Sequence, residues 1–312
     1  MSPDDALVLD PNVDGPASLG ADDLAVEEDA ATRRRFGIAG WLACAWLGLL
    51  AIAVVFADLL PFKDPNAELT IPELAPGQDG FLLGADGNGR DLLARLVYGG
   101  RNSLIISVFS IVLGFLVGGF LGLLSGYYRN WVGKVLTSLF DILLAIPALV
   151  LAMSLVSVLK GDPSQGGGMD PRTILVLTLA IVSVPLIARI TRASTMAWAQ
   201  RDFVTAARAQ GAKDGRILFR EIFPNVLPAM AYIALLGMAI AIVAEGSLAI
   251  LGASVEPPAT TWGVMIVEGK DSMEDASFLM FIPIAVVFLT VLSLNFLGDA
   301  IRDRFDVRES AL

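Results

Sequence analysis

The stretch NSLIISVFSIVLGFLVGGFLGLLSGYY, residues 102–128, decides the fold because it contains no charged side chain. About 20 consecutive apolar residues are enough for an α-helix to cross the hydrocarbon core of a bilayer. The composition of the whole chain agrees, with 55% hydrophobic and 17% charged residues. Soluble domains average about 25% charged residues. The sequence therefore predicts a membrane protein.

Five further apolar stretches have the character of membrane spans. One of them, Thr173–Ala188, would measure about 24 Å as a helix. It crosses if the helix continues past Arg189 and Arg192, whose side chains can reach the interface. A re-entrant segment here would leave an odd number of spans. We expect an all-α membrane protein with six transmembrane helices, the others being Phe36–Ala57, Asn102–Tyr128, Val135–Leu159, Ile222–Ala244 and Ser277–Gly298.

The distribution of basic residues predicts the orientation. With the N-terminus inside, 15 of the 22 Lys and Arg residues fall on the cytosolic side and 7 outside. Cytosolic loops carry the excess of Lys and Arg in most membrane proteins. We therefore expect both ends in the cytosol and four regions: an acidic tail (1–36), the first span with an extracytoplasmic segment (37–100), a transmembrane core (101–300) and a C-terminal tail (301–312).

The acidic tail accounts for much of the net charge of −10. Residues 1–32 contain nine Asp and Glu and no basic residue. Low hydrophobicity combined with high charge is typical of a disordered, solvated segment. An acidic chain of this kind is also a poor candidate for binding nucleic acid.

The sequence lacks the residues that several classes of chemistry require. The chain has one cysteine, Cys44, and no histidine, so we expect no internal disulfide, no His/Cys metal site and no His-dependent triad. It contains no Gly-x-x-x-x-Gly-Lys-[Ser/Thr] phosphate loop. We therefore expect a protein that is not catalytic alone and holds no cofactor, so that any energy for its work arrives through a partner.

Glycines recur every fourth position in the 102–128 stretch, at Gly114, Gly118, Gly122 and Gly126. Residues four apart lie on one face of a helix, and small residues there let another backbone approach closely. The alternative is chance placement, because glycine is common in membrane helices. The register favours a helix-packing face.

The connection at residues 189–225 is too long for a simple turn. Asp202 is a candidate N-cap of a short helix and Gly211 a candidate helix stop. Asp214 is a candidate cap of a second short helix that would end before Pro224. An amphipathic connector lying at the membrane interface is the alternative.

This connection resembles the EAA loop of ABC-importer permeases, which places a glycine and then a proline at fixed distances after two alanines. The positions that match are Ala206, Ala207, Gly211 and Pro224, whereas Thr205 stands where the family usually has Glu. The resemblance implies that the segment, including Asp202 and Phe203, contacts an ATPase subunit.

Other stretches are similar to the C-type subunit of dipeptide, oligopeptide and nickel permeases. They are GADGNGRDLLAR (84–95), YGGRNSL (98–104), DILLAIP (141–147) and WGVM (262–265). The resemblance implies a type I importer fold in the bacterial cytoplasmic membrane. It also implies a homologous B-type permease, two ATPase subunits that bind ATP and Mg, an external binding protein, and peptide as cargo. Nickel and haem remain alternative cargoes.

Two acids lie within predicted spans, Asp141 and Glu245. Such residues are costly in lipid and normally face the bundle interior or a water-filled cavity. Contact with substrate and a hydrogen bond between helices are both open. A proton-coupled secondary transporter would need more titratable residues along its path, and a non-transporting scaffold would not explain the EAA-like loop.

Overall fold

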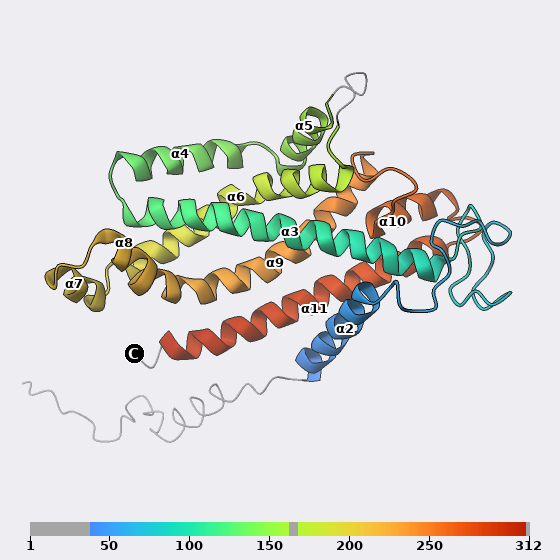
Figure 1. Ribbon diagram of the computed structural model, residues 1–312, viewed down its shortest axis with the longest axis horizontal. Coiled ribbons are helices and arrows are strands. Elements are labelled where there is room, and N and C mark those ends of the chain that lie inside the picture. The colour runs from blue at the N-terminus through green and yellow to red at the C-terminus, as the bar shows by residue number, and fades with distance from the viewer. Residues whose placement is uncertain (1–37, 162–167, 310–312) are drawn as a thin grey trace, which may run out of the picture. The chain divides into compact units, whose positions relative to one another are not determined.

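The computed structural model describes residues 38–161 and 168–309, with the backbone alone from residue 303 (Figure 1). Within these ranges the regular secondary structure is helical, apart from one β-bridge between Ala85 and Asp91, and residues 56–91 form a long non-helical segment. The acidic tail predicted at 1–36 lies outside the described residues. The helices are α2 (Ile38–Val55), α3 (Leu92–Tyr127), α4 (Trp131–Ala145), α5 (Ala148–Lys160), α6 (Pro171–Trp198), α7 (Asp202–Ala209), α8 (Asp214–Arg216), the π-helix η2 (Ile217–Ile222), α9 (Phe223–Ile250), α10 (Trp262–Asp271) and α11 (Phe278–Glu309).

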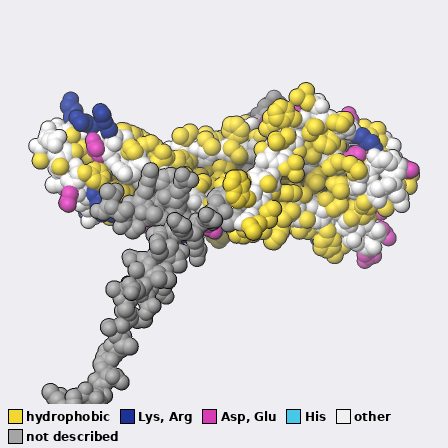
Figure 2. Space-filling model, turned by 90° about the horizontal axis from the view of Figure 1, so that it is seen from below, with side chains coloured by type: hydrophobic (Ala, Val, Ile, Leu, Met, Phe, Trp, Pro, Cys, Tyr) yellow, Lys and Arg dark blue, Asp and Glu magenta, His cyan; other side chains and the backbone are white. Residues whose placement is uncertain are grey.

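Five helical segments among the described residues are long and apolar enough to cross a membrane: α2, α3, α6, the continuous run Asp214–Ile250, and α11. Figure 2 shows hydrophobic side chains over the middle of the visible face, with charged side chains toward its two ends. This distribution is what a bilayer around the middle of a helical bundle requires.

The predicted third span, Val135–Leu159, is two helices rather than one. α4 and α5 are bent by 94° at their junction. Ile146 has an extended backbone (φ −84°, ψ 129°) and Pro147 follows it. Proline disfavours the helical conformation of the preceding residue and has no N–H to donate, so the helix breaks here. The predicted total of six spans holds when this bent pair counts as one.

The fourth span continues past its two arginines, as expected. α6 has 28 residues and includes both Arg189 and Arg192. It begins where Asp170 accepts a hydrogen bond from the Thr173 N–H at 3.3 Å and Pro171 occupies the first turn. The re-entrant alternative for this segment is therefore wrong.

The second and fifth spans begin earlier than predicted. α3 starts at Leu92, where the Asp91 carboxylate accepts from the Ala94 N–H at 2.9 Å. The fifth span begins at Asp214 and runs through η2 into α9. Lys213, rather than Asp214, occupies the N-cap position, and Pro224 lies in the first turn of α9, so no separate helix ends before it.

The glycine face of α3 packs against α6 of the same chain, which confirms the predicted helix contact. A Cβ on Gly118 would lie 2.6 Å from the Val184 carbonyl oxygen, and one on Gly122 would lie 2.6 Å from that of Ala188. Gly126 meets the Arg192 carbonyl oxygen in the same way, whereas a Cβ on Gly114 would meet the Ser183 side chain of α6. The backbones approach too closely for any larger residue at these positions.

We predict that Gly118→Leu destabilises the bundle. Its side chain would force α3 away from α6 at a cost of about 1–3 kcal/mol or more. The measurement is the melting temperature of the detergent-purified protein. Gly48→Leu is the matched control, because a Cβ on Gly48 meets no atom within 4 Å. Equal melting temperatures for the two variants would contradict the packing of α3 on α6.

Candidate functional site

The connection between α6 and α9 contains a short, well-defined helix, α7. Its N-cap is Arg201, which makes no side-chain capping hydrogen bond, so the predicted cap Asp202 lies instead in the first turn. The helix ends before Gly211, which has a φ of +79° and whose N–H donates to the Arg208 carbonyl at 2.9 Å. The predicted helix stop is therefore confirmed, because glycine adopts this left-handed conformation without strain.

One face of α7 is fixed to the rest of the protein. Val204 is fully buried in a cluster with Ile217 and Ile222 of η2, and with Leu123 of α3 and Met230 of α9. Ala207 is partly buried against the same cluster. This packing holds α7 in a defined orientation, because moving it would expose the Val204 side chain to water.

The opposite face of α7 is open. Asp202, Phe203, Thr205 and Ala206 are all exposed, and so is Pro224 at the start of α9. The two alanines of the motif therefore differ: Ala207 faces its own chain and Ala206 faces outward. Phe203 is 39% exposed and Phe219 on η2 is 53% exposed. Exposed aromatic side chains are enriched in protein interfaces.

Tyr127, at the inner end of α3, connects three elements and was not singled out by the sequence. Its hydroxyl donates to the Asp214 carboxylate of α8 at 2.7 Å. The Arg208 guanidinium of α7 lies 5.5 Å from the centre of its ring. Tyr127 therefore ties the start of the long α8–η2–α9 helix to α3, and α7 to both.

Glu245 is 1% exposed near the outer end of α9. Its carboxylate accepts from the hydroxyls of Ser254 and Thr261, both at 2.7 Å, and from that of Ser103 at 3.5 Å. Thr261 is also the N-cap of α10. Hydrogen bonds of this kind offset the cost of burying a carboxylate, so the structure places Glu245 in an interhelical contact that joins α9, α10 and α3.

Asp141 does not lie in the interior of this chain. It is exposed on α4 beside exposed apolar residues that include Leu139 and Ile142. The apolar exposure continues along α5 at Leu149, Val150 and Val158. The α4–α5 face is therefore an apolar surface with one carboxylate. Asp141 and Glu245 belong to different parts of the molecule.

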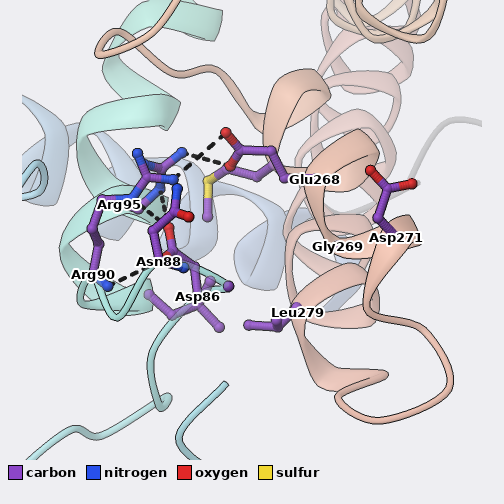
Figure 3. A pocket seen from close by; sticks show the side chains of 11 residues that line it. Asp86, Asn88, Arg90, Arg95, Glu268, Gly269, Asp271 and Leu279 are labelled. Atoms are coloured by element: carbon purple, nitrogen blue, oxygen red, sulfur yellow. Dashed lines mark hydrogen bonds and ion pairs between the residues drawn. The ribbon is translucent and has the colours of Figure 1, made fainter. Parts of the chain in front are cut away.

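The motif at residues 84–95 builds a polar cluster at the other end of α3 (Figure 3). Asp86 accepts from Arg90 Nε at 2.7 Å, and Arg95 Nε lies 3.2 Å from the same carboxylate. Arg95 Nη2 donates to Glu268 of α10 at 2.6 Å. The cluster thus joins the start of α3 to α10, and the sequence did not indicate Glu268 as its partner.

Nearby, Asp58 joins the segment after α2 to α3. It accepts from Arg101 Nη1 at 2.9 Å and from the Tyr98 hydroxyl at 3.0 Å. The hydrogen bond from Arg101 lowers the pKa of Asp58, and the one from Tyr98 acts in the same direction. The Asp58 side chain is 62% exposed, so this contact is a weak tether.

The arrangement of these helices is similar to that of a chain in a solved ABC transporter. In a solved structure of the MetNI methionine ABC transporter in inward-facing conformations, a chain matches this one with a TM-score of 0.56 and 19% identity. The match covers 68% of this chain and 95% of the other. At this level of identity the likeness concerns the fold.

The chain belongs to the family described as the binding-protein-dependent transport system inner membrane component, whose model matches residues 114–310. It is 38% identical over 264 residues to the di/tripeptide transport system permease protein DppC of Pseudomonas aeruginosa, covering 83% of this chain and 84% of that one. It is 34% identical over 259 residues to the glutathione transport system permease protein GsiD of Pectobacterium atrosepticum, with 83% of each chain covered.

We predict that Tyr127→Phe loosens the α7–α8 segment, because it removes a hydrogen bond to a carboxylate worth about 1.5–3 kcal/mol at most. Backbone amides of residues 202–216 should exchange faster with deuterium, measured by mass spectrometry. Tyr128→Phe is the control, since its hydroxyl makes no hydrogen bond to the described residues. The same exchange rates in both variants would show that Tyr127 does not hold the segment.

Proposed function

We propose that this chain is a permease subunit of an ATP-driven importer that brings di- and oligopeptides across the bacterial cytoplasmic membrane. The observation that carries the proposal is its similarity, over more than four fifths of its length, to permeases named for di/tripeptide and glutathione transport. Glutathione is itself a modified tripeptide, so the two names share a short-peptide cargo.

The energy of ATP hydrolysis would be transmitted to this chain through the exposed face of α7. Two cytosolic ATPase subunits would bind ATP and Mg, one docking on Phe203, Thr205 and Ala206 of this chain and the other on the partner permease. Because Val204 packs α7 against η2, a displacement of α7 would be transmitted to the helix that begins at Asp214. That helix continues to Ile250 and carries Glu245, which holds α10 near the outer end.

The α4–α5 face supports a second part of the proposal. A homologous B-type permease would cover the exposed apolar residues of this face and complete a path for the peptide. The carboxylate of Asp141 would then face a shared cavity instead of lipid, where its charge is tolerable. An extracytoplasmic binding protein would deliver the peptide to the outer side of the membrane. The distribution of Lys and Arg in the sequence predicts that the Arg95 end of α3 lies on that side.

We predict that Ala206→Trp leaves the membrane bundle folded but weakens binding of the ATPase subunit. Ala206 is exposed, so the new side chain clashes with the partner rather than with its own chain. Co-purification of the ATPase subunits measures the loss. Ala51→Trp, on the exposed surface of α2, is the matched control. Full recovery of both ATPase subunits with Ala206→Trp would exclude α7 as the docking site of the subunit assigned to this chain.

We further predict that the reconstituted complex accumulates a radiolabelled dipeptide in proteoliposomes when ATP and the binding protein are supplied. A proton gradient without ATP should give no accumulation, which separates the importer from a proton-coupled transporter. Accumulation of nickel or haem, with no uptake of peptide, would reassign the cargo within the family. Uptake driven by the proton gradient alone would contradict the proposal.

A further inference from the structure

The polar cluster at the outer end of α3 encloses a pocket of about 200 Å³ between the 84–91 loop and α10 (Figure 3). Charged and amide side chains line one part of it, and Leu92, Met265 and Leu279 line another. A volume of this size is well below that of a typical pocket for a drug-sized ligand, about 300–1,000 Å³. It suits a group the size of one amino-acid residue.

The charges at the base of the pocket nearly cancel. Asp86 and Glu268 are paired with Arg90 and Arg95. Arg95 is 1% exposed, yet its Nε and Nη1 atoms have no hydrogen-bond partner among the described residues. Nε lies 3.2 Å from the Asp86 carboxylate as an ion pair, whereas Nη1 has no ion-pair partner either. A buried N–H of a charged group that lacks an acceptor costs free energy, so an acceptor entering the pocket is stabilised there.

The rim adds a free carboxylate and a free amide. Asp271 and Asn88 both line the pocket and are exposed. Neither side chain makes a hydrogen bond or ion pair with another described residue. Because the two ion pairs below are balanced, Asp271 leaves the pocket with a net negative charge. A matching ligand therefore carries a positive charge and, beside it, an oxygen that accepts a hydrogen bond.

We propose that this pocket binds the amino-terminal residue of a peptide, with its ammonium group at Asp271 and its first carbonyl oxygen at Arg95 Nη1. The small side chain of that residue would lie against Met265 and Leu279. A free amino acid has the same ammonium group, but its carboxylate would lie beside those of Asp86 and Glu268. The neutral carbonyl of a peptide avoids this repulsion. The inference rests on the proposed function, because an importer receives its peptides at the extracytoplasmic side, where this pocket lies.

The test uses the complete permease–ATPase complex in detergent, without the binding protein, and titrates it calorimetrically with trialanine. We expect binding to the native complex, and affinity about tenfold lower for N-acetyl-trialanine and for the Asp271→Asn complex, because each loses one ionic hydrogen bond. Glu274→Gln, an exposed acid three residues further on that does not line the pocket, is the matched control and should bind as the native complex does.

Three outcomes would overturn the inference. Equal binding of acetylated and free trialanine would exclude an ammonium site, and tighter binding of free alanine would assign the pocket to amino acids. Unchanged trialanine affinity in Asp271→Asn, with weakened capture of the binding protein, would make it a protein-docking surface. The same native complex is then reconstituted into proteoliposomes with its binding protein, and ATP-driven peptide uptake is measured. Uptake without Asp271-dependent binding in detergent contradicts this inference alone and leaves the proposed function standing.

Discussion

The close contact between α3 and α6 is the constraint on which the rest of the structure depends. Glycines 114, 118, 122 and 126 let the two backbones meet along most of the span. Both candidate sites are built at the ends of α3: Tyr127 contacts Asp214 of α8 at one end, and Arg95 contacts Glu268 of α10 at the other. The α3–α6 contact therefore fixes the element from which both sites are built.

Much of the fold could be predicted from the sequence because the signals are local. A run of apolar residues indicates a span, and the four-residue spacing of glycine indicates the face that packs. Hydropathy does not report direction, so it could not show that α4 and α5 meet at 94°, although Pro147 marks the break. Hydropathy also underestimated the length of α3, because Arg95 and Arg101 are charged and yet lie within the helix.

The candidate site, like the fold, could be predicted only where the signal lies in a short stretch of sequence. A helix stop at Gly211 could be predicted because glycine adopts the left-handed conformation without strain, and Asp202 indicated a short helix before it. The inward direction of Val204 and Ala207 depends on η2, α3 and α9, which lie far away in sequence. Tyr127 and Asp214 are 87 positions apart, and Arg95 and Glu268 are 173 apart. Pairs so distant carry no local pattern, and the helix packing alone brings them together.

We propose that the outward face of α7 receives the force of one ATPase subunit. The most direct measurement replaces Phe203 by the photoreactive analogue benzoyl-phenylalanine in the assembled complex, with the analogue at Trp41 of α2 for comparison. We predict that light produces a cross-linked product containing this chain and an ATPase subunit from position 203, and none from position 41. Absence of that product from position 203, in a complex that still hydrolyses ATP, would contradict the account.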